Sequence, residues 1–181
     1  MENRLLKAEG SLRFFAIVFL VLTAVLVRLD TETKLIFISE RKATYKDIKA
    51  LVILVTVDFA VAGFHLLQLS KCLILASVGG KTVGSSTNLT WLSFLLDQMV
   101  TYVSFGILSA STQAAVLAIT GESHLEWTKL CDKYTRFCYQ IGGALFCGVA
   151  SLLVMVLITS ISAFNLFRLY SHNHFLILKG R

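Results

Sequence analysis

Hydrophobic and polar residues are segregated along this chain into long blocks. Four blocks are almost wholly apolar and cover residues 12–29, 51–78, 91–119 and 137–169. Each is about as long as, or longer than, the roughly 20 apolar residues that cross a bilayer as a helix. The pattern therefore predicts an integral membrane protein with four transmembrane helices.

The segments between the blocks are short and carry much of the charge. They cover residues 30–50, 79–90 and 120–136, and they are too short and too poor in strand alternation to bury cores of their own. Hydrophobic residues make up 56% of the chain and charged residues 15%, which leaves little for a soluble domain. We expect an all-α fold, a four-helix membrane bundle, with residues 1–181 as one tetraspan domain.

The first apolar block could also be a signal peptide, because Arg4 and Lys7 precede it. The block is longer than the apolar region of most signal peptides, and residues 25–30 contain Arg28 and bulky side chains in place of a small-residue cleavage site. We predict a retained first span.

Four spans place both termini on one side of the membrane, and loop charge should indicate which side. With the termini inside, the cytoplasmic segments hold eight Lys and Arg residues and the outer loops nine, so the positive-inside rule does not decide. The outer basic residues are interleaved with acidic ones, whereas the middle loop and the C-terminal tail contain no acid. On this weaker signal we expect cytoplasmic termini.

Asp97 is an acidic residue well inside the third apolar block. An ionised carboxylate without a partner is expensive in hydrocarbon, so such a residue usually has a role. Arg13 enters the first block from the same side, and its long stem and planar guanidinium suit a bidentate pair with Asp97. The alternative is that Arg13 extends to lipid headgroups and Asp97 carries a proton; residue types alone leave both open.

Two stripes of residues run along the third block. One stripe holds polar and small side chains, at Asp97, Thr101, Ser104, Leu108, Ser111 and Ala115. The other is a row of small residues with four-residue spacing, at Gly106, Ala110, Ala114 and Ala118. Small rows let helix backbones approach, and hydroxyl groups can bridge between helices. The row serves either packing inside the bundle, which is the commoner use, or contact between protomers.

Asp58 and His65 lie two turns apart on one face of the second block. Two ionisable groups inside a span could form a proton relay, which would favour a small-solute or ion conduit. No chain of acids or histidines continues through the other blocks. An isolated Asp58 that bonds to a neighbour such as Thr56 or His65 is the preferred interpretation.

Catalytic and cofactor motifs are missing from the sequence. It has no glycine-rich phosphate loop, no nucleophile elbow and no His-Glu-x-x-His motif. His172 and His174 alone make a weak metal site. We therefore predict no enzyme activity, no cofactor and no metal. The net charge of +6 is scattered, which suits anionic membrane lipid better than nucleic acid.

The cysteines give a further hint about the third loop. Cys131 and Cys138 lie in or beside it, and they could form a disulfide if the loop faces an oxidising compartment. Two free thiols are the alternative, since spacing does not determine connectivity. Cys72 and Cys147 are typical of packing residues.

Several short strings together resemble a known family. They are Phe94-Leu-Leu-Asp97-Gln98, Tyr102, Gly121, Trp127, Cys131, Phe137-Cys138 and Ile161-Ser-Ala-Phe-Asn-Leu. In this order they are similar to the Casparian strip membrane domain protein-like family of plants, which is distantly related to MARVEL-type tetraspans. The similarity covers nearly the whole chain.

The resemblance implies a plasma-membrane tetraspan with cytoplasmic termini that forms homo-oligomers and hetero-oligomers with related tetraspans. Such proteins make stable membrane platforms and organise local cell-wall modification with extracellular partners. Residues that match the family's embedded charges are Arg13 and Asp97, and those that match its second outer loop are Gly121, Trp127, Cys131, Phe137 and Cys138. Residues 30–49 lack the stretch associated with true Casparian strip proteins.

Overall fold

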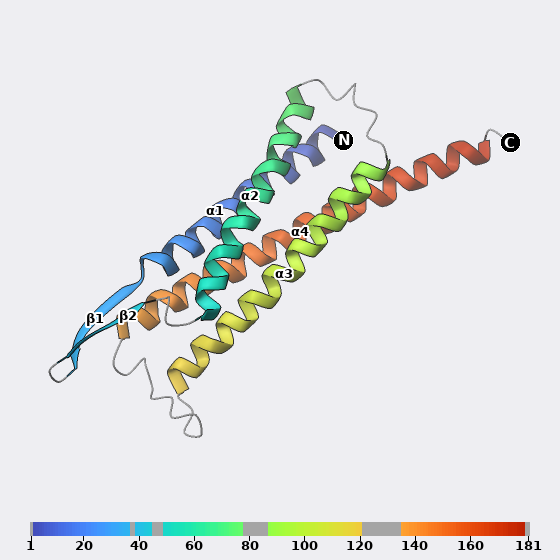
Figure 1. Cartoon of the computed structure of the whole chain (residues 1–181). Coiled ribbons are helices and arrows are strands. Elements are labelled where there is room, and N and C mark those ends of the chain that lie inside the picture. Colours follow the sequence, from blue (N-terminus) through green and yellow to red (C-terminus); the bar gives the residue numbers. More distant parts are fainter. Residues whose placement is uncertain (1, 37–38, 45–48, 78–86, 121–134, 180–181) are drawn as a thin grey trace.

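The computed structural model describes residues 2–36, 39–44, 49–77, 87–120 and 135–179. These residues form α1 (Glu2–Leu29), β1 (Thr31–Ile36), β2 (Ser39–Thr44), α2 (Lys49–Ser77), α3 (Thr87–Thr120) and α4 (Thr135–Lys179). The helices form an elongated bundle with both chain termini at one end and the strands at the other (Figure 1). We call these the terminal end and the hairpin end.

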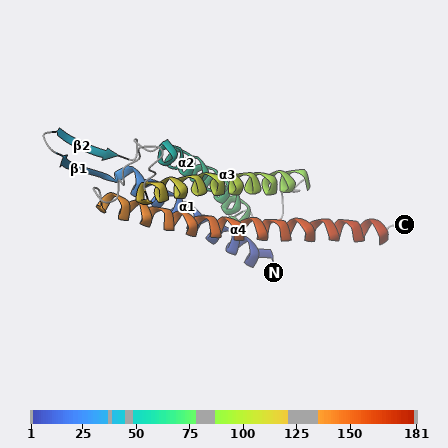
Figure 2. The ribbon, with the colours of Figure 1, turned by 90° about the horizontal axis from the view of Figure 1, so that it is seen from below.

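Each helix contains a stretch that is long and apolar enough to cross a membrane. The four stretches are Lys7–Leu29, Lys49–Ile74, Thr90–Thr120 and Cys138–Phe167. The predicted all-α fold with four transmembrane helices is thereby confirmed. α4 is much longer than its apolar stretch, and at the terminal end it extends past the other helices (Figure 2).

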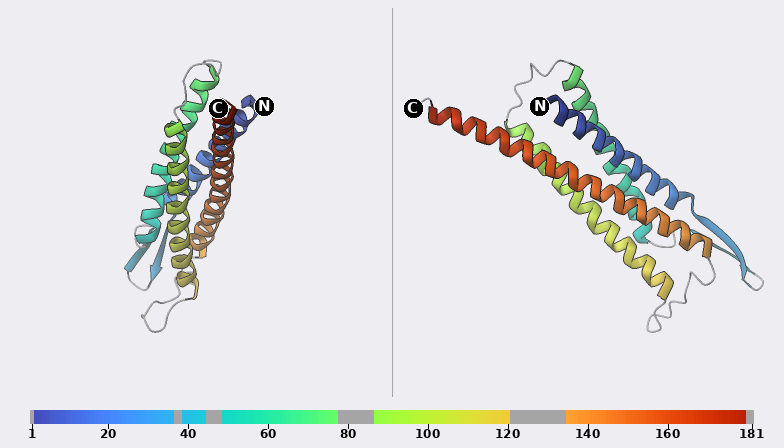
Figure 3. Two further views of the ribbon diagram at one scale, coloured as in Figure 1. Left: turned by 90° about the vertical axis from the view of Figure 1, so that its right-hand side faces the viewer. Right: turned by 180° about the vertical axis from the view of Figure 1, so that it is seen from behind.

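The helices are arranged so that α1 and α3 lie at opposite corners of the bundle. α1 packs mainly against α2 and α4, and α3 packs against the same two helices. From behind, α4 runs between α1 and α3 along much of the bundle (Figure 3). A link between α1 and α3 must therefore come from side chains long enough to cross the interior.

Two apolar layers fill the interior. The first layer consists of Ala16, Leu20, Val61, Ala62, Met155 and Ile158. The second layer lies nearer the hairpin end and consists of Ala24, Val27, Leu51, Leu54, Val55, Leu108, Ile141, Ala144 and Leu145. Large apolar side chains also cover the outside of the bundle, for example Phe146 (76% exposed) and Leu67 (68% exposed). Apolar residues both in the interior and on the outer face are expected of a helix bundle that is surrounded by lipid.

The hairpin between α1 and α2 was not predicted from the sequence. β1 pairs with β2 in antiparallel register from Thr31↔Thr44 to Ile36↔Ser39. The strands are short, and neither glycine nor asparagine separates them in the sequence, so the usual hairpin signal is missing. β1 also lies against α4, which supports a hairpin that would be marginal alone.

Candidate functional site

The most unusual feature of the bundle is a buried salt bridge between α1 and α3. Nη1 of Arg13 donates to Oδ1 of Asp97 at 3.0 Å, and Nη2 donates to Oδ2 at 2.7 Å. The two side chains are 2% and 1% exposed. The sequence left this pair open, and the structure forms it with bidentate geometry, the strongest arrangement for these groups.

Glu9 and His65 complete the cluster around the guanidinium. Oε1 of Glu9 accepts from Nε of Arg13 at 3.1 Å and from Nη2 at 2.8 Å, while Nδ1 of His65 lies 3.4 Å from Nη1. A guanidinium has five N–H donors, and Arg13 directs all five at these three side chains. We call Glu9, Arg13, His65 and Asp97 the ion cluster.

The ion cluster connects three helices at one level of the bundle. Glu9 and Arg13 come from α1, His65 from α2 and Asp97 from α3. Asp97 is seven residues from Thr90, where its apolar stretch begins, which places it roughly 10 Å inside the span. Because α1 and α3 occupy opposite corners, the salt bridge acts as a diagonal brace across the interior.

Sequence reasoning missed the role of Glu9. The signal was present, because an acid and an arginine four residues apart are neighbours on a helix. Glu9 is 17% exposed, so it lies at the edge of the cluster.

We expect Glu9→Gln to lower the free energy of unfolding by only about 1 kcal/mol, since the hydrogen bonds between Arg13 and Asp97 remain. Chemical denaturation in detergent, with Glu2→Gln as the matched control on the same helix, measures the difference.

Asp58 does not have the partner expected from the sequence. His65 bonds to Arg13 instead, and the Thr56 hydroxyl donates to the carbonyl oxygen of Val52 in its own helix. Oδ2 of Asp58 is buried without a hydrogen-bond partner among the described residues. Pairing with Thr56 or His65 was therefore wrong: Nδ1 of His65 faces Arg13, and Nε2 of His65 is itself buried without a partner among the described residues.

The polar stripe of α3 faces the interior, but its hydroxyl groups behave differently from one another. The hydroxyl of Ser111 donates to the carbonyl oxygen of Ala50 at 3.3 Å and so bridges α3 and α2. Thr101 donates to the carbonyl oxygen of Asp97 within its own helix. The hydroxyl of Ser104 is buried and lacks a partner in the described part of the chain. Among these three, only Ser111 bridges two helices directly.

The row of small residues in α3 divides between two environments. Gly106 and Ala110 lie exposed on the outside of the bundle, Ala114 is half-buried and Ala118 is buried. A Cβ atom added at Gly106 would meet no atom within 4 Å. The first half of the row therefore makes no close contact with the other described helices, whereas the second half turns into the bundle.

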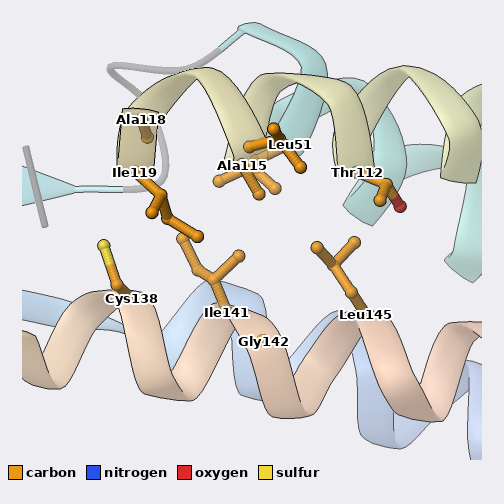
Figure 4. A pocket seen from close by; sticks show the side chains of 10 residues that line it. Leu51, Thr112, Ala115, Ala118, Ile119, Cys138, Ile141, Gly142 and Leu145 are labelled. Atoms are coloured by element: carbon orange, nitrogen blue, oxygen red, sulfur yellow. The ribbon is translucent and has the colours of Figure 1, made fainter. Parts of the chain in front are cut away.

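A cavity of about 170 Å³ lies between α3 and α4 near the hairpin end. Figure 4 shows Ala115 and Ile119 of α3 facing Ile141 and Leu145 of α4 across it. Its lining is almost wholly apolar, and the hydroxyl of Thr112 donates to the carbonyl oxygen of Leu108 in its own helix. The buried end of the small-residue row thus borders an apolar gap between the two helices.

The predicted outer-loop residues fall largely outside the described residues. Gly121, Trp127 and Cys131 are not described, and Phe137 and Cys138 belong to the first turn of α4. Cys138 is disulfide-bonded, whereas Cys72 and Cys147 are free thiols. Because Cys131 is not described, the Cys131–Cys138 disulfide stays a prediction.

Histidine, cysteine and carboxylate side chains do not gather into a metal site in the part of the chain that the structure describes. The side chains of His172 and His174 lie outside that part. Among the described residues, the ionisable groups that lie together are those of the ion cluster, where the opposite charges of Arg13 and the carboxylates offset one another.

The fold and the ion cluster define a class, the tetraspan membrane proteins whose bundle is braced by a buried ion pair. Residues 2–154 match the Casparian strip membrane protein domain, and the chain belongs to this family. It is 51% identical over 174 residues to CASP-like protein 2C1 of Populus trichocarpa, with 96% of each chain covered. It is 46% identical to CASP-like protein XL3 of Gossypium hirsutum, with 99% of each chain covered. No solved structure matches the chain.

Proposed function

We propose that this protein is a non-enzymatic scaffold of the plasma membrane. It self-associates into membrane platforms that organise localised modification of the cell wall. Membership of the Casparian strip membrane protein domain family supports this role. Its partners are membrane lipid, further copies of itself, related tetraspans and wall-modifying proteins outside the cell.

The observation that carries the proposal is that every N–H donor of the Arg13 guanidinium has a partner within the bundle. Each N–H group of its guanidinium is directed at Glu9, His65 or Asp97, and the salt bridge to Asp97 is almost completely buried. A charge that is bonded in this way holds helices together and has no donor left for a passing solute. A rigid bundle of this kind suits a protein that presents fixed surfaces to its neighbours.

A conduit for small solutes or ions is the competing function. It needs a continuous polar path from Asp97 through Asp58 to the serines of α3. Between the ion cluster and Asp58, the first apolar layer fills the interior with Leu20, Met155 and other buried side chains. Beyond Asp58, the second apolar layer follows. Two dry layers interrupt the path, which favours the scaffold.

The orientation of the protein in the membrane determines which of its segments face the cell wall. With cytoplasmic termini, the β1–β2 hairpin and residues 121–134 face the outside, where wall-modifying proteins act. The Cys131–Cys138 disulfide also requires an oxidising exterior. The β1–β2 hairpin follows the second apolar layer, so a braced bundle would hold it at a fixed height above the membrane.

Single-particle tracking of a fluorescent fusion in plant plasma membrane tests the proposal. We expect most molecules to be confined to patches, with lateral diffusion about tenfold or more below that of an unrelated monomeric tetraspan, because linked bundles move as one body. Purified protein in liposomes should show no solute or ion flux above empty vesicles. Free diffusion of all molecules, or flux that disappears in Asp97→Asn, would contradict the scaffold role.

A further inference from the structure

A second polar centre lies between the two apolar layers. It is a small space of about 10 Å³ lined by Asp58 of α2, Ser104 of α3 and Gly148 and Ser151 of α4, together with Leu20 and Leu54. Asp58 and Ser104 are seven residues from His65 and Asp97, respectively. Since α2 and α3 are antiparallel neighbours, the two centres are two helical turns apart, roughly 10 Å.

The polar atoms of this centre lack direct partners. Oδ2 of Asp58 and Oγ of Ser104 are buried without a hydrogen bond to any described residue, and the two residues are 5% and 7% exposed. Oγ of Ser151 donates to the carbonyl oxygen of Gly148 at 2.7 Å, which leaves its lone pairs free to accept. In a membrane interior, polar groups without partners are strongly unfavourable.

We infer that this space binds one water molecule, which joins α2, α3 and α4. A buried water needs about 10–15 Å³ of space and two to four polar partners. The space has about that volume, and it offers a carboxyl oxygen and two hydroxyl groups. The water satisfies the buried atoms of Asp58 and Ser104 that no group of the described residues reaches, and it accounts for an acidic residue so far from Arg13.

A metal cation fits this space less well. Hard cations such as Ca²⁺ take six to eight oxygen ligands, and the described lining supplies three side chains with oxygen. Leu108 packs closely on Gly148 at the edge of the space, because a Cβ atom added at residue 148 would lie 2.7 Å from Cδ1 of Leu108. The site therefore has room for a single small neutral molecule held by hydrogen bonds.

The direct test is a structure of the full chain in lipid nanodiscs at a resolution that shows ordered water. We expect one density peak within hydrogen-bond distance of both Asp58 and Ser104. An empty space, a direct hydrogen bond between Asp58 and Ser104, or a peak with the short distances and many oxygen ligands of a metal ion would each overturn the inference.

Thermal unfolding of Ser104→Ala gives a second test, because the direction in which the melting temperature changes distinguishes a bound water from a dry space. If water binds, removing the hydroxyl weakens its site, and the melting temperature should fall by about 2–4 °C. If the space is dry, removing an unpaired hydroxyl should leave the melting temperature unchanged or raise it. Ser109→Ala is the matched control, because Ser109 is exposed on the same helix and its replacement should have little effect. A Ser104→Ala protein that melts at or above the wild-type temperature would overturn the inference.

Discussion

Replacing Arg13 by methionine should lower the free energy of unfolding by about 3–5 kcal/mol, the largest single-residue effect that we expect in this protein. Methionine nearly matches the length of the arginine stem and keeps its apolar packing. The loss comes from Asp97, which is 1% exposed and would remain in the bundle without its bidentate partner. Its two hydrogen bonds, at 3.0 and 2.7 Å, disappear together.

Reversible unfolding of purified protein in mixed micelles measures this effect. Arg28→Met is the matched control, because Arg28 is exposed on the same helix, and its replacement should change stability by less than about 0.5 kcal/mol. The double variant Arg13→Met with Asp97→Leu should regain much of the loss, since apolar pairs often replace buried ion pairs at little cost. If Arg13→Met were as stable as Arg28→Met, the salt bridge would not brace the bundle.

Neutralising either member of the salt bridge should also affect assembly, because neighbouring molecules can dock only on a correctly formed bundle. Blue-native electrophoresis with crosslinking should show that Arg13→Gln and Asp97→Asn reduce the oligomer fraction by half or more. A loss of about 1.4 kcal/mol already changes an association constant tenfold. Unchanged oligomers and normal surface delivery in both variants would remove the ion pair from the assembly mechanism.

The four spans could be predicted, and Asp97 could be singled out as a carboxylate inside a span, because each inference depends on one segment of the sequence alone. An apolar block of sufficient length crosses the bilayer whatever its neighbours do. A carboxylate inside such a block requires a partner, so its position alone marks it. The identity of the partner depends on how α1 and α3 align across the interior, and no local pattern encodes that alignment.

His65 and Asp58 illustrate what the sequence could not provide. They share a face of α2, and the sequence grouped them as possible partners of each other. In the bundle, His65 lies beside Arg13 of α1, whereas Asp58 lines a space formed with α3 and α4. Because His65 and Asp58 are two helical turns apart on α2, their side chains contact different neighbouring helices. Their roles therefore differ, although they share one face of α2.

The hairpin was missed for a different reason. Residues 31–44 contain no strong turn residue, and each strand is only six residues long. Strand pairing here is supported by the position of the segment at the end of α1 and by contact with α4. The periodicity of hydrophobic residues in one segment does not report such contacts with other parts of the fold.

Replacing Gly106 by leucine should disrupt self-association while leaving the bundle intact. Gly106 is exposed in the middle of α3, and an added Cβ atom would meet no atom within 4 Å. A leucine there faces only lipid in the isolated protein, but it would separate two helices that pack through Gly106 and Ala110. We expect the melting temperature to stay within a few degrees of wild type, and the self-association constant to fall about tenfold or more.

Resonance energy transfer between labelled molecules in liposomes, titrated against lipid, measures the association constant. Gly63→Leu is the matched control, because Gly63 is also exposed with no atom near an added Cβ, and its neighbours at four-residue spacing are Phe59 and Leu67 instead of small residues. It gains the same bulk and the same helix propensity at a surface without a small-residue row. A loss of association in Gly106→Leu alone would place the protomer contact on α3. Equal association in both variants would mean that Gly106 and Ala110 face lipid, and that molecules meet through another surface.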